Sequence, residues 1–372
     1  MRRLLLPLIV AVLLSGAARR RVVSPPSDVR PGTLTVIASM SEPRAVHTST
    51  LLHNGLVLIA GGLASGSTRS AELYDPEQRT FRRTGTMVSA RAEHTATLLP
   101  DGNVLIAGGL NTQMLSSSEV YDPATGTFSS GPSMTTRRSG HTAVLLPNGK
   151  VLLAGGTTGS TSDWTFLASA ELYDPVTRRF TATGSMMAPR ASHTATLLPN
   201  GRVLITGGHV GRGAAVQIYA TAEIYDPVTA TFRPTGAMTH IRHKHSAALL
   251  PDGRVLINGG ADARDDRGTY RDTEIYDPAI ETFIRGPEMQ LDRYKHADTS
   301  LLLPNGRVLI AGGAAQAEVF DPRRNSFTVV GGEARMRGSF SAVTVLPNGQ
   351  AIITGGYGQG FGAANAAWLF TP

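Results

Sequence analysis

Short apolar runs recur along the chain, and each one ends at a pair of glycines. In VLIAGG at 104–109, four apolar residues precede the pair. A run without polar positions is typical of a strand that is buried on both faces. Successive pairs are separated by 47, 47, 52, 52, 53 and 43 residues, a period that predicts an array of similar structural units. The pairs are Gly61-Gly62, Gly108-Gly109, Gly155-Gly156, Gly207-Gly208, Gly259-Gly260, Gly312-Gly313 and Gly355-Gly356.

An Asn-Gly or Asp-Gly pair precedes every apolar run. Asp101-Gly102, for example, separates the run at 94–99 from the run at 104–107. Such pairs favour a type I′ turn, whose two central residues both need a positive φ. Each unit is therefore predicted to open with an antiparallel hairpin. The pairs are Asn54-Gly55, Asp101-Gly102, Asn148-Gly149, Asn200-Gly201, Asp252-Gly253, Asn305-Gly306 and Asn348-Gly349.

Two further strands complete each unit. After a loop of variable length, SEVYDP at 118–123 predicts a third strand that ends at a turn, and Thr127-Phe128 begins a fourth. Four antiparallel strands repeated seven times predict an all-β protein, a seven-bladed β-propeller.

The two ends of the repeat array complement each other. The last unit ends with its third strand at 367–372, and TLTVIASM at 33–40 matches the fourth strand of the first unit, TFRRTGTM at 80–87. We therefore expect the N-terminal strand to complete the last blade and to close the ring, which removes an unpaired sheet edge.

The N-terminal segment has the features of a secretory signal. Arg2 and Arg3 precede an apolar stretch at 4–14, and small residues follow at 15–18. The apolar stretch is shorter than the ~20 residues that span a bilayer. We expect a signal peptide at 1–18, a linker at 19–32 and the propeller at 33–372. The protein is expected to be secreted or periplasmic, with no membrane span.

Composition excludes several function classes. The net charge is +7, but the basic residues are dispersed, and only three are lysines: Lys150, Lys244 and Lys295. Nucleic-acid binding usually requires a basic patch, so none is expected. The chain has no cysteine, which excludes a disulfide, a thiol nucleophile and a Cys-ligated metal. A monomer is expected.

The repeat resembles the kelch family. The Gly-Gly pair, the later Tyr-Asp-Pro and an aromatic residue in strand four, such as Phe128, carry the resemblance. Kelch propellers include copper-dependent galactose oxidases, bacterial sialic-acid mutarotases and non-catalytic binding proteins, so the fold does not settle the function. The chain resembles a bacterial secreted kelch protein, a galactose-oxidase-like propeller without the copper-radical site, because that site requires a Cys joined to a ligand Tyr.

An Arg-x-x-His motif precedes the first strand of six units, and a Glu lies in the third strand of the same units. All three are replaced together in the seventh unit, by Gly338, Ser341 and Trp368. Joint loss favours a structural hydrogen-bond network within each blade. The alternative is a ring of guanidinium groups that binds an anion. The residues are Arg44, His47, Glu72, Arg91, His94, Glu119, Arg138, His141, Glu171, Arg190, His193, Glu223, Arg242, His245, Glu274, Arg293, His296 and Glu318.

A histidine-rich segment at 240–245 breaks the repeat. His243 and His245 share a face of an extended chain, and His209 follows the Gly pair of the preceding unit. Such imidazoles could bind Zn or Cu. Arg242 and Lys244 would repel a cation, so we expect no metal and no cofactor.

The loops between strands two and three vary most among the units. Loops on a rigid scaffold commonly carry binding residues, and aromatic and Arg side chains suit recognition. Solvated loops without a binding role are the alternative. The candidate binding residues are Trp164, Phe166, Arg212, Tyr219, Arg264, Arg267 and Tyr270.

These features favour a non-catalytic binding protein that recognises a protein or glycan outside the cytoplasm. No residue is assigned as catalytic, because no acid, base or nucleophile stands out from the repeat. The alternative is an enzyme that acts on a sugar acid, as the sialic-acid mutarotases do. That alternative requires non-repeated polar residues that converge at one end of the propeller axis.

Overall fold

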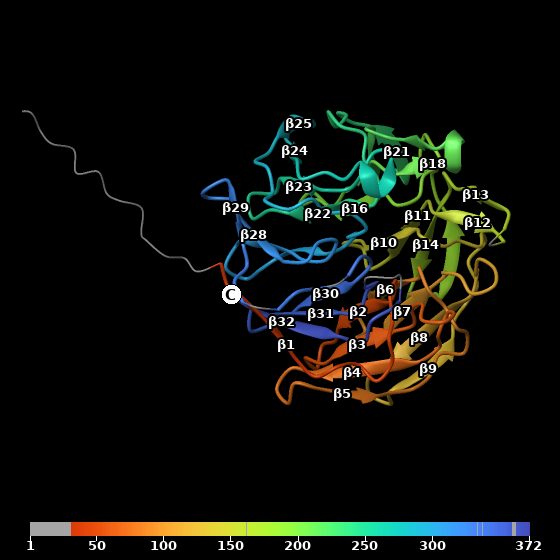
Figure 1. Cartoon of the computed structure of the whole chain (residues 1–372). Helices are drawn as coiled ribbons and strands as arrows, with labels where there is room; N and C mark the ends of the chain where they lie inside the picture. The colour runs from red at the N-terminus through yellow and green to blue at the C-terminus, as the bar shows by residue number, and fades with distance from the viewer. Residues whose placement is uncertain (1–30, 161, 333, 337, 359–361) are drawn as a thin grey trace, which may run out of the picture. The chain divides into compact units, whose positions relative to one another are not determined.

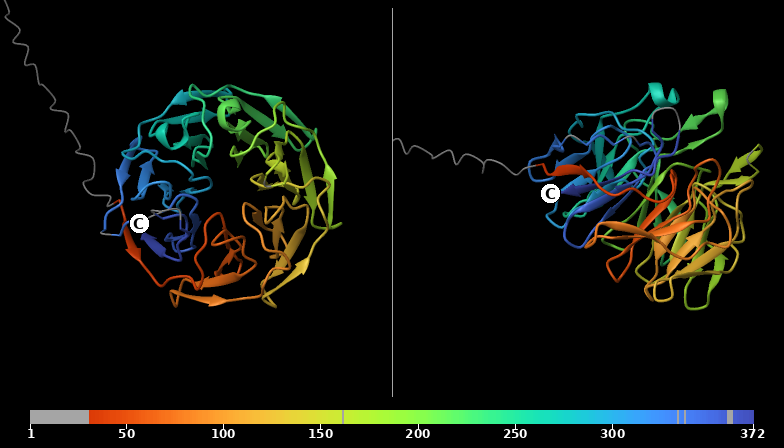
Figure 2. Two further views of the ribbon diagram at one scale, coloured as in Figure 1. Left: turned by 45° about the vertical axis from the view of Figure 1, so that its right-hand side comes forward. Right: turned by 60° about the horizontal axis from the view of Figure 1, so that its bottom comes forward.

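Seven four-stranded antiparallel sheets are arranged around a central axis (Figures 1 and 2). The computed structural model describes residues 31–160, 162–332, 334–336, 338–358 and 362–372. The expected signal peptide and linker residues up to 30 lie outside the described residues. The innermost strands of successive blades contact one another around the whole ring, including the contact between the last blade and the first. The predicted seven-bladed all-β propeller is confirmed.

The blades follow one another along the chain. Blade 1 contains β2 (Thr48–Leu51), β3 (Val57–Ala60), β4 (Ala71–Asp75) and β5 (Thr80–Arg83). Blade 2 contains β6 (Thr95–Leu98), β7 (Val104–Ala107), β8 (Ser118–Asp122) and β9 (Thr127–Ser130). Blade 3 contains β10 (Thr142–Leu145), β11 (Val151–Ala154), β14 (Ala170–Asp174) and β15 (Arg179–Ala182). Blade 4 contains β16 (Thr194–Leu197), β17 (Val203–Thr206), β20 (Ala222–Asp226) and β21 (Thr231–Pro234). Blade 5 contains β22 (Ser246–Leu249), β23 (Val255–Asn258), β24 (Thr273–Asp277) and β25 (Thr282–Arg285). Blade 6 contains β26 (Ser300–Leu302), β27 (Val308–Ile310), β28 (Glu318–Asp321) and β29 (Ser326–Val329). Blade 7 contains β30 (Ala342–Val345), β31 (Ala351–Thr354), β32 (Ala367–Thr371) and β1 (Thr33–Val36).

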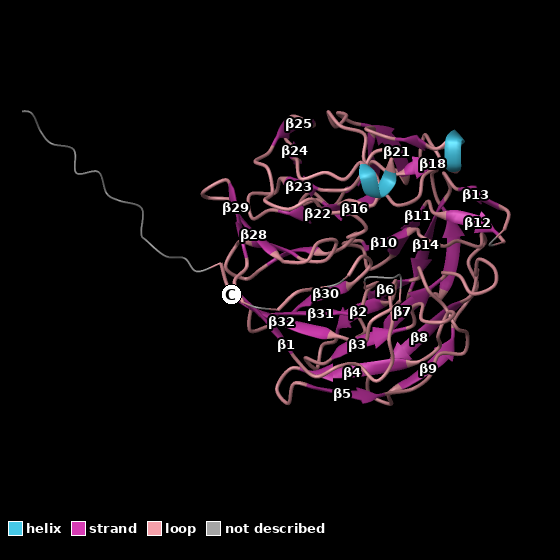
Figure 3. Ribbon diagram, viewed as in Figure 1, coloured by secondary structure: helices cyan, strands magenta, loops and turns pink. Residues whose placement is uncertain are grey.

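Small elements decorate the loops between strands two and three. Blade 3 carries the hairpin β12 (Thr157–Gly159) and β13 (Trp164–Phe166), and blade 4 carries β18 (His209–Val210) and β19 (Gln217–Ile218). The only helices among the described residues are two single turns, η1 (Gly213–Ala215) and η2 (Asp265–Arg267), shown in cyan in Figure 3. Neither is long or apolar enough to cross a membrane.

The hydrophobic core lies between neighbouring blades. Every residue of β7 is buried, as the apolar run predicts. Leu105 packs with Val151 and Tyr173 of the next blade in one cluster. Burial of apolar surface on both faces of each second strand therefore joins the blades to one another.

The Gly-Gly pair lies where the next blade begins. Gly108 and Gly109 have φ of +62° and +89°, and the Gly109 amide donates a 2.9 Å hydrogen bond to the Arg138 carbonyl. A Cβ on Gly108 would clash with the same carbonyl. Only glycine provides both the left-handed backbone and the space at this position, which explains the repeat of the pair.

The N-terminal strand closes the ring. β1 pairs antiparallel with β32, and Leu34 lies opposite Phe370. Both side chains are buried. The predicted closure is confirmed.

A circle of residues with a left-handed backbone surrounds the axis just before the innermost strands. One residue per blade, between the Arg and His positions, has φ between +51° and +60°. Backbone hydrogen bonds join many neighbours in this circle; the Glu93 amide, for example, donates to the Val46 carbonyl at 3.2 Å. The seven residues are Val46, Glu93, Gly140, Ser192, Lys244, Lys295 and Phe340.

Candidate functional site

The repeated Arg and Glu side chains pair inside their own blades. In blade 2 the Arg91 guanidinium donates to the Gly108 carbonyl at 2.7 Å and to Glu119 Oε1 at 2.8 Å. The Glu119 carboxylate also accepts from the Val88 amide at 2.7 Å. Arg91 and Glu119 are buried, so this guanidinium presents nothing to solvent. The same pairing joins Arg44 to Glu72, Arg138 to Glu171, Arg190 to Glu223, Arg242 to Glu274 and Arg293 to Glu318.

The repeated histidines have different partners. His94 Nε2 lies 3.1 Å from the Thr48 hydroxyl of the preceding blade, and His47 Nε2 lies 2.8 Å from Thr354 of blade 7. The same relation joins His141 to Thr95, His193 to Thr142 and His245 to Thr194. Burial lowers the pKa of His47 to about 3, so the ring is neutral at pH 7. The Arg–Glu pairs act within a blade, whereas these histidines link neighbouring blades.

Six polar residues that depart from the repeat converge at one end of the axis. We call them the axial cluster: His209, His243, Lys244, Asp265, Tyr294 and Lys295. His209 begins β18 of blade 4, and Asp265 begins η2 in blade 5. The other four lie in the turns that lead into β22 and β26. Three blades therefore contribute to one site.

Lys244 lies at the centre of this cluster. Its ammonium donates hydrogen bonds to the Tyr294 hydroxyl at 2.8 Å and to Asp265 Oδ1 at 3.1 Å. His243 Nε2 lies 3.3 Å from the same carboxylate oxygen, and His243 Nδ1 lies 3.3 Å from His209 Nδ1. The Asp265 side chain is 46% exposed and that of Lys244 is 21% exposed, so solvent reaches the cluster.

The electrostatics of the cluster favour neutral imidazoles. Burial, and then the Lys244 ammonium, lowers the pKa of His209 to about 4. Burial lowers the pKa of His243 to about 3, with Lys244 and His209 contributing and Asp265 opposing. At pH 7 each ring therefore has one N–H donor and one acceptor nitrogen.

The sequence interpretation identified only part of this cluster. It singled out His209, His243 and Lys244 in a histidine-rich patch, but it did not include Asp265, Tyr294 or Lys295. One signal was present: Lys244 and Lys295, two of only three lysines, occupy the same repeat position. The other five units have Val, Glu, Gly, Ser or Phe there, so the blade itself does not require a lysine.

The predicted loop residues divide into two groups. The Arg212 guanidinium lies 4.2 Å from the Trp164 ring centre, and Phe166 contacts His209 edge-on at 5.2 Å between ring centres. The first group thus lies beside the axial cluster.

The second group has local partners or none. The Tyr219 and Tyr270 rings lie near the buried guanidinium groups of Arg190 and Arg242, at 5.0 and 5.3 Å. Arg264 pairs with Asp262 at 2.6 Å in its own loop. Arg267 is exposed on η2. Arg267 lies on the same turn as Asp265 of the axial cluster.

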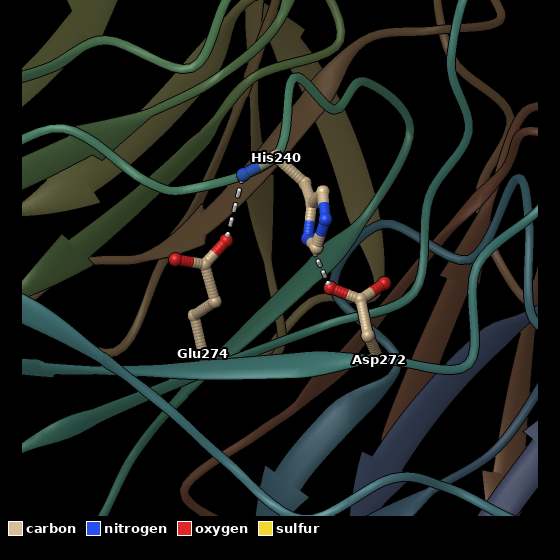
Figure 4. A group of neighbouring side chains, drawn as sticks. All are labelled: His240, Asp272 and Glu274. Atoms are coloured by element: carbon tan, nitrogen blue, oxygen red, sulfur yellow. Dashed lines mark hydrogen bonds and ion pairs between the residues drawn. The ribbon is translucent and has the colours of Figure 1, made fainter.

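One other group has the composition of a metal site. Ligand atoms of His240, Asp272 and Glu274 all lie within 4.8 Å of one another (Figure 4), and no other group of this kind occurs among the described residues. However, the Arg242 guanidinium lies 2.7 Å from Asp272 Oδ2 and 3.1 Å from Glu274 Oε1. Its charge already compensates both carboxylates, so the group has little attraction for a cation.

Comparisons with known proteins agree with the repeat. The Kelch motif family model matches residues 44–88 and 137–187. A galactose oxidase of Gibberella zeae is 31% identical over 134 residues, which cover 35% of this chain and 20% of the relative. The match therefore spans about a fifth of the length of that relative.

Two solved structures share the fold. A fungal alcohol oxidase of the AA5 family, in complex with copper, has a TM-score of 0.74 at 14% identity and covers 92% of this chain and 77% of its own. YjhT has a TM-score of 0.62 at 16% identity and covers 79% of this chain and 99% of its own.

The residues of the axial cluster do not fit copper. The His209 and His243 rings are adjacent, but burial and then the Lys244 ammonium lower the pKa of both rings. A divalent cation would meet the same repulsion. The chain also has no Cys for a tyrosine–cysteine cross-link.

The family assignment rests on agreement between the fold and the repeat. Seven sheets of four antiparallel strands carry the Gly-Gly and Tyr-Asp-Pro signature, and the Kelch motif model matches two separate segments. The two Kelch motif matches and the seven-bladed fold together support a kelch-repeat β-propeller.

Proposed function

We propose that this protein is a non-catalytic binding protein that acts outside the cytoplasm and recognises an acidic glycan at the axial cluster. The convergence of Lys244 and Lys295 carries the proposal. Lys244 pairs with Asp265, whereas no carboxylate of the described residues lies within ion-pair distance of Lys295. A carboxylate on the ligand would supply the missing negative charge.

The surroundings of the lysines suit a sugar. The neutral His209 and His243 rings can donate to and accept from hydroxyl groups. Trp164 and Phe166 offer ring surface beside them, and the Arg212 guanidinium adds planar donors. None of these side chains belongs to the repeated Arg–Glu pairs that hold each blade.

The experiment measures, by isothermal titration calorimetry, the binding of glucuronate, N-acetylneuraminate and neutral galactose. We expect the acids to bind and galactose not to bind. Lys244→Met and Lys295→Met should each weaken acid binding by about tenfold, which corresponds to ~1.4 kcal/mol. Lys150→Met is the matched control, because Lys150 is the third lysine and pairs with Asp174 at 3.4 Å in blade 3, which contributes no residue to the axial cluster. Equal binding of galactose, or equal loss in all three variants, would contradict the proposal.

A second candidate function is proton transfer on a bound sugar acid, as in a mutarotase. The observation that favours it is the hydrogen-bonded pair of imidazoles, which are neutral at pH 7 and therefore keep an unprotonated ring nitrogen. Interconversion of sugar anomers needs a proton removed from the anomeric hydroxyl and one delivered to the ring oxygen. Magnetisation exchange between the anomers of N-acetylneuraminate would test it. Wild-type protein should accelerate the exchange and His243→Asn should not.

A further inference from the structure

Lys295 occupies an unusual position in the axial cluster. It is partly buried, its backbone has a φ of +56°, and it belongs to the circle around the axis. Its Nζ lies 4.9 Å from the centre of the Tyr294 ring and 5.7 Å from that of Phe340. The two rings fix the position of the amine without giving it an acceptor.

The charged groups around Lys295 come from two other segments. Lys244 approaches from the turn before β22, and Asp265 and Asp266 approach from η2. The Lys244 ammonium is held by Asp265 and Tyr294, so its charge stays beside Lys295. His243 and the Tyr294 hydroxyl are further titratable neighbours, and His243 is neutral at pH 7.

These surroundings make Lys295 easier to deprotonate. Burial, and then Lys244, lowers the pKa of Lys295, whereas Asp265 and Asp266 act in the opposite direction. A desolvated lysine beside another cation is an arrangement that makes an amine nucleophilic near neutral pH. Lys150, by contrast, has a carboxylate partner and a 40% exposed side chain.

We propose that Lys295 forms an imine with a 2-oxo acid, such as the open-chain form of an acidic sugar whose ketone lies next to its carboxylate. The inference rests on the proposed function, because Lys244 would receive that carboxylate in exchange for Asp265. The adjacent carbonyl carbon would then lie at the Lys295 amine.

The reaction requires no oxidant or reductant. The nitrogen lone pair of Lys295 attacks the carbonyl carbon, and the π electrons of the C=O bond move to its oxygen. A proton then passes from nitrogen to oxygen to give a carbinolamine. Loss of the hydroxyl group as water, with one further proton, leaves a protonated imine. The positive charge of this imine lies beside the ligand's own carboxylate.

The test traps this imine by reduction. The full chain is incubated with pyruvate and cyanoborohydride, and the modified lysine is located by peptide mass spectrometry. We expect one adduct, on Lys295, at a rate that saturates with pyruvate and exceeds the rate at Lys150 by at least about tenfold, which corresponds to ~1.4 kcal/mol in activation free energy. In urea-unfolded protein the two lysines should react alike.

Variants separate this inference from the proposed function. Lys295→Arg has no nucleophilic amine, so it should lose the adduct. Lys244→Met should slow trapping with pyruvate but not with acetone, a ketone without a carboxylate. Equal labelling of Lys150 and Lys295 in the folded chain would contradict the assignment of Lys295 as the nucleophile. Equal trapping of acetone and pyruvate would contradict the preference for a 2-oxo acid. Glucuronate binding without any trapping would overturn only this inference.

Discussion

The Lys244 ammonium donates a 2.8 Å hydrogen bond to the hydroxyl of Tyr294, which belongs to the next blade. Neither residue type is required by the repeat, because the other five units hold Val, Glu, Gly, Ser or Phe at the lysine position and Ala or Ser at the position before it. The bond therefore links blades 5 and 6 through side chains that the scaffold does not need. The polar atoms of these two side chains are therefore available to contact a ligand.

We predict that Asp265→Asn strengthens the binding of acidic ligands. The Asp265 carboxylate lies 3.1 Å from Lys244 Nζ and 3.3 Å from His243 Nε2, the place that a ligand carboxylate would take. Removing its charge removes a competitor for Lys244. Because the aspartate is about half exposed, the gain should be modest, about two- to fivefold in affinity for glucuronate.

The matched control is Asp266→Asn, the same change of charge at the next residue of η2. Asp266 is exposed and forms no ion pair with any residue that the structure describes, so its effect should be smaller. Calorimetry of both variants with one glucuronate stock makes the comparison. Weaker binding by Asp265→Asn would show instead that the carboxylate positions Lys244 for the ligand.

The repeated Arg–Glu pair is predicted to stabilise its blade. Glu171→Ala would leave the buried Arg138 guanidinium without its carboxylate, at a cost of about 3–5 kcal/mol in the free energy of unfolding. Urea unfolding measures this loss. Arg179→Ala, an exposed arginine in β15 of the same blade, should change stability by little. Unchanged stability together with lost anion binding would favour the guanidinium ring instead.

The sequence predicts the fold well because its signals are local. Asn-Gly turns and Gly-Gly pairs are each read within a few residues, and closure follows from the match between 33–40 and 80–87. The site depends on contacts across blades. Lys244 and Tyr294 are 50 residues apart, and no spacing rule indicates that these two side chains meet.

The histidines illustrate the same limit. The His of the motif is replaced in the seventh unit together with the Arg and the Glu, which indicated one shared network. The structure instead pairs Arg91 with Glu119 and places His94 against Thr48 of the preceding blade. Joint loss identifies residues with a common role in the repeat, but it does not identify which atoms touch.

Stability should fall as the solution is acidified below neutral pH. Burial is the main cause that lowers the pKa of His47 and His193 to about 3 in the folded chain, whereas an unfolded histidine titrates near 6.5. The unfolded state therefore binds more protons between these values. The stability from the neutral rings is fully present above pH ~6.5 and is lost as pH falls toward ~3.

Melting temperature measured from pH 7 to pH 4 checks this prediction. His94→Gln should flatten the dependence, because burial also holds the pKa of His94 well below its usual value. His53→Gln, at an exposed position, is the control and should leave the slope unchanged. A melting temperature that rises on acidification would contradict the predicted loss of stability at low pH.

Removal of the N-terminal strand should weaken the whole ring. A chain that starts at residue 41 lacks β1, so β32 would expose its unpaired edge and Phe370 would lose its cross-strand partner Leu34. Compared with a chain that starts at residue 31, we expect a lower melting temperature and aggregation at high concentration. Identical melting of the two chains would show that closure is dispensable.

The Trp164–Arg212 pair should contribute to recognition without supporting the fold. The two side chains come from the loops of blades 3 and 4, and the guanidinium lies 4.2 Å from the ring centre. Both loops leave the blade after its buried second strand, so the Arg–Glu pairs and the core between blades do not depend on them. Trp164→Ala and Arg212→Ala should each weaken binding of an acidic glycan several-fold and leave the melting temperature unchanged.

The double variant gives the sharper result. If the ring and the guanidinium act as one surface, their losses will not add, because the first change already disrupts the partner of the second. Arg267→Ala tests whether the same surface extends to η2, where Arg267 is exposed. If affinity for the glycan is the same in all three variants but falls when the Asp101-Gly102 hairpin is altered, recognition lies on the opposite face of the propeller. That outcome would also separate the ligand from Lys244, since the turns that carry the axial cluster and the Asp-Gly hairpins lie at opposite ends of the innermost strands.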